Sequence, residues 1–156
     1  MKLKSYLSLA FFVGVSLLAG VIGSFSTMES ITGWYTTIVQ PSWTPPNWVF
    51  GPVWTTLYVL MGVAAFLVSR SPKKGKVFII WLFLAHLIVN AFWTIAFFGL
   101  HELLLSVLVI LVLLGLIVTL IRLFWVHSKA AAWLMVPYLL WVCYATSLSI
   151  GFLVLN

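Results

Sequence analysis

The chain of 156 residues has very little charge, and it is especially poor in acidic residues. Only 6% of its residues are charged, against about a quarter in a typical soluble domain. Glu29 and Glu102 are its two acids. Hydrophobic residues make up 64% of the chain, and the mean hydropathy is +1.22. Polar side chains are too few to cover a surface facing water, so the sequence indicates an integral membrane protein.

Other absences exclude whole classes of activity. The chain has no G-x-x-x-x-G-K-[ST] phosphate loop, so it does not power transport with nucleotide. No Asp or Glu lies in the middle of an apolar run, which removes the usual proton relay and the acid–base pair of a conventional hydrolase or transferase. His86, His101 and His127 lie on different segments and indicate no metal site. The single cysteine, Cys143, excludes an intramolecular disulfide, and we expect it to be buried in the last helix.

Long uncharged runs predict five membrane-spanning helices. A helix needs about 20 apolar residues to cross the hydrocarbon core of a bilayer. The uncharged run 30–69 is too long for one such helix and contains a proline-rich stretch, so it divides into a loop and a helix. The predicted fold is one all-α domain over 1–156, a five-transmembrane-helix bundle with a Pro/Trp-rich first extracellular loop. Its helices are expected at about 5–27, 47–69, 77–99, 103–126 and 131–154.

Basic residues gather at one expected end of this bundle. All eight Lys and Arg lie at the N-terminus, around the second-to-third helix connection, or around the fourth-to-fifth, whereas both acids lie opposite. Since Lys and Arg favour the cytoplasmic side, we expect the N-terminus in the cytoplasm and the C-terminus outside. This distribution accounts for the net charge of +6 without a nucleic-acid partner. Alternatively, Lys2 and Lys4 begin a signal peptide, although the following apolar segment is longer than usual and lacks a clear A-x-A site.

The stretch "PSWTPPNWVFGPVW" at 41–54 is the least usual part of the sequence. It holds four prolines and three tryptophans, and Trp34 brings the tryptophans within 21 residues to four. An aromatic belt at the membrane–water interface would explain tryptophan here, but not the stiffening prolines. A rigid loop loses less conformational entropy when a ligand binds beneath it. We therefore expect a pre-shaped aromatic lid, with Trp34, Trp43 and Trp48 over a pocket.

Three helical stripes lie beneath this expected lid. Residues four apart or seven apart share one side of a helix, and the stripes are Trp54 and Tyr58; His86, Asn90, Trp93 and Phe97; and Tyr138, Trp141, Ala145, Leu148 and Ser149. An amide in a membrane helix needs a partner or a cavity, and a proline such as Pro137 bends a helix and opens space. Ordinary core packing is the alternative for each stripe. Together they favour a pocket for a large, flat, apolar ligand, whereas the Leu/Val/Ile-rich fourth helix is expected to face lipid.

These motifs resemble the translocator protein family, also called tryptophan-rich sensory proteins (the TspO/peripheral benzodiazepine receptor group). The resemblance is carried by "WYTTIVQPSWTPPNWVFGPVWTTLY" from Trp34 to Tyr58, by "NAFWTIAFFG" from Asn90, and by "PYLLWVCYATSLS" from Pro137. It implies a five-helix bundle, a homodimer, and a pocket under the first loop for protoporphyrin IX or isoquinoline-carboxamide-type ligands. Pocket positions implied by the resemblance are Ser24, Thr27, Pro45, Trp54, Asn90, Trp93, Trp141 and Ala145. With the stripes and the loop, the candidate ligand-binding set adds Trp34, Trp43, Trp48, Phe50, Tyr58, Phe97, Tyr138 and Ser149.

The sequence also departs from the family pattern. No Lys or Arg follows Tyr144, which argues against the cholesterol-associated pattern of animal members. Ser149 stands in place of an asparagine, and Gln40 replaces the usual base before Pro41, so the loop lacks a cation for a porphyrin propionate. The small-residue spacing of Ser16, Gly20 and Ser24 allows close helix approach, as in a dimer. Short length suits a bacterial plasma-membrane member.

Three functions follow from these expectations. The first is a receptor or sensor that binds tetrapyrroles and needs no further cofactor. The second is light- and oxygen-dependent degradation of bound protoporphyrin IX, with Trp54 and Trp141 as the residues required for it. The third is a passive translocator of porphyrin or lipid.

Overall fold

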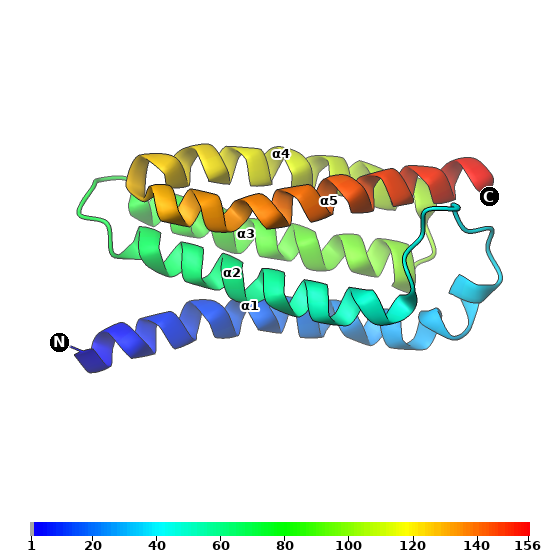
Figure 1. Cartoon of the computed structure of the whole chain (residues 1–156), viewed down its shortest axis with the longest axis horizontal. Helices are drawn as coiled ribbons and strands as arrows, with labels where there is room; N and C mark the ends of the chain where they lie inside the picture. The colour runs from blue at the N-terminus through cyan, green and yellow to red at the C-terminus, as the bar shows by residue number, and fades with distance from the viewer. Residues whose placement is uncertain (1) are drawn as a thin grey trace.

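The computed structural model describes residues 2–156, and the expected five-helix bundle is confirmed. The helices are α1 (Lys2–Ile31), α2 (Phe50–Ser69), α3 (Lys76–Thr94), α4 (Leu103–His127) and α5 (Lys129–Leu155). Five segments of these lengths and compositions are long and apolar enough to cross a membrane. The N-terminal end, the α2–α3 loop and the α4–α5 turn lie at one end of the bundle, and the α1–α2 loop lies at the other with the C-terminal end (Figure 1).

The helix ends differ slightly from the expected ones. Helix α1 is longer than 5–27 at both ends, since no proline interrupts it and Gly33 follows its last residue, Ile31, by only two positions. Two short 3₁₀ turns, η1 (Trp34–Thr36) and η2 (Asn47–Val49), flank the prolines of the loop. Helix α3 ends in a π-helical turn, η3 (Ile95–Gly99). Helix α5 continues through Pro137.

The basic end of the bundle is closed by short connections that bind helix carbonyls. Lys76 Nζ donates to the carbonyl oxygens of Ser69 and Ser71 over 3.1 and 2.9 Å, and Lys73 Nζ donates to that of Val126. Ser128 Oγ accepts a hydrogen bond from the Ala131 backbone N–H and so begins α5 one residue after α4 ends. These contacts satisfy backbone groups that helix ends leave without partners.

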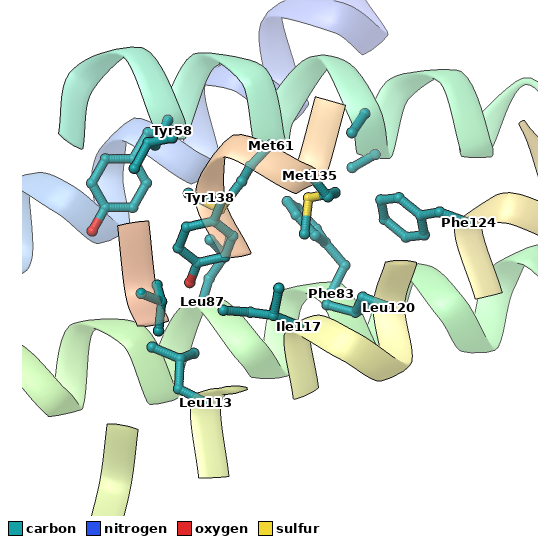
Figure 2. Packing of buried hydrophobic residues seen from close by; sticks show 14 of the residues in the cluster. Tyr58, Met61, Phe83, Leu87, Leu113, Ile117, Leu120, Phe124, Met135 and Tyr138 are labelled. Atoms are coloured by element: carbon teal, nitrogen blue, oxygen red, sulfur yellow. The ribbon is translucent and has the colours of Figure 1, made fainter. Parts of the chain in front are cut away.

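The core fills the basic half of the bundle. Buried side chains from α2, α3, α4 and α5 point toward one another there, and they include Met61, Phe83, Leu113, Ile117, Leu120, Phe124 and Met135 (Figure 2). This corrects the expectation that α4 simply faces lipid, because one side of α4 packs into the core while Leu108, Val112 and other residues stay exposed. Cys143 is also corrected, since it is exposed on the outer side of α5.

The small-residue stripe of α1 packs inside the chain. Ser16 is fully buried, and a Cβ on Gly20 would collide with the Tyr58 ring. One turn beyond, a Cβ on Gly23 would meet Thr94 of α3 at 3.1 Å. The stripe therefore allows close approach of helices, as its spacing indicated. Ser16 and Gly20 make that approach to helices of the same chain, so these two residues provide no surface for a dimer.

Candidate functional site

A cavity of about 320 Å³ lies at the acidic end of the bundle, beneath the α1–α2 loop. Its walls come from α1, α2, α3, η3 and α5, and α4 does not contribute. No charged side chain belongs to the lining, which consists largely of aromatic rings with a few hydroxyls. Apolar walls with few polar groups are typical of sites for small organic ligands.

Trp54 lies at the centre of the aromatic wall. Its ring stacks on Tyr58 with 5.7 Å between centroids, and it lies 5.8 Å from Trp93 and 6.5 Å from Trp141. These three tryptophans come from α2, α3 and α5, so the bundle brings together residues far apart in sequence. Aromatic pairs at such separations stabilise each other and leave ring faces available for stacking.

Two indole groups in this wall have no hydrogen-bond acceptor among the described residues. They are the N–H groups of Trp93 and Trp141, both buried. A buried donor without a partner costs free energy, and a ligand carbonyl or ring nitrogen that reached these groups would remove that cost. Both N–H groups lie within the packed wall, so a ligand atom would reach them only after a movement of the indole rings.

The outer end of the cavity is closed by a second aromatic cluster. Tyr35 is only 2% exposed, and its ring lies 5.4 Å from Phe152 of α5 and 6.4 Å from Phe97. The π-helical turn η3 turns both Phe97 and Phe98 into the lining. Burial, with a further contribution from Tyr144, raises the pKa of Tyr35 to about 12, so its hydroxyl stays neutral at physiological pH.

Below the cavity, a buried hydrogen-bond chain joins three helices. The Tyr58 hydroxyl donates to Asn90 Oδ1 over 2.5 Å, and Asn90 Nδ2 donates to the Tyr138 hydroxyl over 3.0 Å. Asn90 is fully buried and lies behind the lining. Its amide thus has partners, as a membrane helix requires, and it holds the tyrosines that support Trp54.

Replacing Asn90 by leucine should lower the free energy of unfolding by about 1.5 kcal/mol, because two buried hydroxyls lose their partner. The change should be measured by reversible unfolding in mixed micelles. Tyr138→Phe, which removes one hydroxyl from the chain and leaves the amide bonded to Tyr58, serves as the milder comparison. Equal stability of Asn90→Leu and the parent would contradict a structural role for this chain of hydrogen bonds.

The structure brings ten of the sixteen candidate ligand-binding residues together in the lining. These ten are Ser24, Thr27, Phe50, Trp54, Tyr58, Trp93, Phe97, Trp141, Ala145 and Ser149. Asn90 and Tyr138 lie immediately behind it, in the hydrogen-bond chain. His86 is fully buried nearer the core, with Nδ1 bonded to the Phe83 carbonyl.

The four loop residues Trp34, Trp43, Pro45 and Trp48 lie outside the lining. Trp34 stacks on His101 with 4.2 Å between ring centroids, Trp43 packs near Gly151, and Trp48 is 75% exposed. The loop therefore closes the cavity with Tyr35, whereas its tryptophans pack around the rim or face outward.

Sequence reasoning missed several lining residues. Tyr35, Tyr144 and Phe152 close the outer end, and Leu17, Gly20 and Gly23 of α1 form one side. Phe152 could have been found by extending the stripe of Trp141 and Ala145, since it lies at i+11 from the first and i+7 from the second. Nothing in the sequence distinguishes the buried Tyr35 from its neighbour Trp34.

Comparison with known proteins agrees with these features. The model of the TspO/MBR family matches residues 12–155. Among curated relatives, Tryptophan-rich protein TspO of Chlorobaculum tepidum is 41% identical over 156 residues, covering 98% of each chain. The Tryptophan-rich sensory protein of Cereibacter sphaeroides is 34% identical over 79% of this chain and 77% of its own. Human Translocator protein is 32% identical over 85% of this chain and 82% of its own. The chain belongs to the TspO/MBR family of membrane proteins.

Proposed function

We propose that this chain is a membrane receptor or sensor for tetrapyrroles such as protoporphyrin IX and for similar flat apolar ligands, including isoquinoline carboxamides. The observation that carries the proposal is the uncharged cavity walled by Trp54, Trp93 and Trp141. Flat rings bind well between aromatic side chains. The names of two relatives, Tryptophan-rich sensory protein and Translocator protein, are compatible with a ligand-responsive role.

The orientation in the membrane is part of the same proposal. Arg70, Lys73, Lys74 and Lys76 belong to the α2–α3 connection and the first residue of α3 at one end of the bundle. Glu29 in the last turn of α1 and Glu102 just before α4 belong to the other end. The basic end then faces the cytoplasm of a bacterial plasma membrane, and the cavity lies in the outer half. A homodimer is proposed from the family resemblance, with no surface assigned to it.

A titration of the full chain in nanodiscs with protoporphyrin IX tests the proposed binding. We expect saturable quenching of tryptophan fluorescence together with a shift of the porphyrin Soret band. Empty nanodiscs give the control for partition into lipid. Quenching that rises without saturation, in parallel with the empty discs, would contradict specific binding.

Light-driven degradation of the bound porphyrin is the second candidate function. It is favoured by the indole cluster, in which Trp54 lies 6.5 Å from Trp141 between ring centroids. The porphyrin would supply the excited state and dioxygen the oxidant, while the protein holds oxidisable indoles beside the ring. A sensor without turnover uses these rings only for stacking, which a phenyl or phenol ring also provides.

Trp141→Phe separates the two candidate functions. The ring that remains still stacks, so we expect affinity for protoporphyrin IX to fall by less than about threefold, whereas the rate of Soret bleaching under light and oxygen should fall by about tenfold or more. Trp133→Phe, an exposed tryptophan on the same helix, is the matched control. Bleaching at the parent's rate in Trp141→Phe would remove the photochemical role from this residue.

A further inference from the structure

The cavity has exposed lining residues on one side. Val21 and Ser24 of α1 and Gly51 and Thr55 of α2 are exposed to the outside and also line the cavity. Lining residues from α3, η3 and α5 are instead buried or half-buried. The opening of the cavity therefore lies between α1 and α2.

This opening arises because α1 changes its packing partner along its length. In its basic half, α1 touches α2 so closely that a Cβ on Gly62 would lie 2.5 Å from Val13 Cα, and Gly20 meets Tyr58. Further along, Gly23 meets Thr94, and a Cβ on Gly99 would lie 3.0 Å from Ser26 Oγ. Beyond Gly20, α1 thus packs on α3 and η3.

The loop above the cavity is fastened to the end of α5. The Asn156 side chain accepts from the Val39 backbone N–H over 2.9 Å and donates to the Val39 carbonyl over 3.0 Å. The Tyr144 hydroxyl donates to the carbonyl of Trp43 over 2.7 Å. Gly151 lies against Pro41 and Trp43, and a Cβ there would lie 2.7 Å from Pro41 Cγ and 3.0 Å from Trp43 Cζ2. Passage of a ligand through the loop would have to break these contacts.

From these contacts we infer that ligands enter and leave the cavity sideways, from the lipid of the outer half of the bilayer, through the opening between α1 and α2. The inference rests on the proposed ligand-binding function. With a rise of about 1.5 Å per residue, Ser24 and Val21 lie about 10 and 15 Å from the end of α1 at Ile31. At that depth the opening faces acyl chains, because the hydrocarbon core is about 30 Å thick. Its ligands are flat apolar molecules already dissolved in the membrane.

A disulfide between the loop and α5 tests whether the loop must open. A Cβ on Gly151 would lie 3.3 Å from Pro41 Cβ, close to the separation of about 3.5–4.5 Å in disulfides. Neither residue lines the cavity. Pro41→Cys with Gly151→Cys, in a Cys143→Ser background, therefore locks the loop when oxidised and frees it when reduced. We expect protoporphyrin IX to associate with the oxidised and reduced forms in nanodiscs at rates equal within about twofold.

Narrowing the opening between α1 and α2 should instead slow the exchange of ligand. In Ser24→Phe we expect association and dissociation of protoporphyrin IX both to slow by about fivefold, because a barrier alters both rates alike. Ser24 also lines the cavity, so slower dissociation is the sign that distinguishes a barrier from a weakened site. Ser147→Phe is the matched control, since Ser147 is also exposed and also donates to the carbonyl three residues earlier. A Phe that merely filled part of the cavity would instead speed dissociation of the ligand.

The outcomes distinguish failure of the sideways route from failure of the proposed ligand-binding function. If oxidation of the loop pair slows exchange about tenfold and reduction restores it, ligands pass the loop and the sideways route is wrong. Unchanged rates in Ser24→Phe, or a raised Kd without slower association, also contradict it. Every rate is measured with protoporphyrin IX and with an isoquinoline carboxamide. If neither saturates the parent protein, the proposed function fails and this inference fails with it.

Discussion

Ala145→Phe should strongly weaken binding of protoporphyrin IX while the bundle stays folded. Ala145 is 6% exposed, lines the cavity, and lies one helical turn from Trp141 on one side and from Ser149 on the other. A phenyl group at this position would extend into the cavity, where it would occupy the space of the ligand ring. We expect affinity to fall by about a hundredfold, equivalent to about 2.8 kcal/mol, in the nanodisc titration.

Cys143→Phe is the matched control for this prediction. It adds a phenyl group two residues away on the exposed side of α5, where the group would point into lipid. Affinity should then equal that of the parent. If Ala145→Phe bound porphyrin as tightly as the parent and Cys143→Phe do, the ligand would not occupy this cavity.

Gly62→Ala should destabilise the bundle more than alanine at any other helical glycine. The new Cβ would lie 2.5 Å from Cα, 2.8 Å from N of Val13, and 2.9 Å from the Phe12 carbonyl oxygen. These are backbone atoms, so no rotamer change relieves the overlap and α1 must move away from α2. We expect a loss of about 3 kcal/mol in the free energy of unfolding, the upper end of the usual cost of overpacking.

Gly115→Ala is the control, because nothing lies within 4 Å of the added Cβ on α4. It should leave stability unchanged or raise it by up to about 1 kcal/mol, as alanine favours the helix over glycine. Both variants are compared by reversible unfolding in mixed micelles. Equal effects of the two substitutions would show that α1 and α2 do not pack as closely as described.

The helices could be predicted from sequence because the lipid bilayer limits the length and the charge of any segment that crosses it. Uncharged runs must be about as long as the bilayer is thick, and charges must lie at their ends. The helical stripes likewise predicted Trp54, Trp93 and Trp141, because a helix fixes which residues share a side. Both signals come from local geometry, which a single sequence carries.

Other features depend on partners far away in the chain. Trp34 and Tyr35 are neighbours, yet Trp34 stacks on His101 while Tyr35 closes the cavity against Phe152. The positions of η3, α5 and the residues that follow η3 decide between them. Ser16 and Gly20 have the spacing of a dimer surface but pack within the chain. Cys143 faces outward because its neighbours on α5, Val142 and Ala145, take the inner side.

The indole N–H resonances of the nine tryptophans offer the most direct measurement of where the ligand lies. Spectra of ¹⁵N-labelled protein would be recorded in micelles with increasing protoporphyrin IX and assigned with single Trp→Phe variants. We expect saturable shifts of Trp54, Trp93 and Trp141, with Trp81, Trp125 and Trp133 unchanged, because those three are exposed away from the cavity. Shifts confined to the exposed tryptophans, or spread evenly over all nine, would contradict binding in the aromatic cavity.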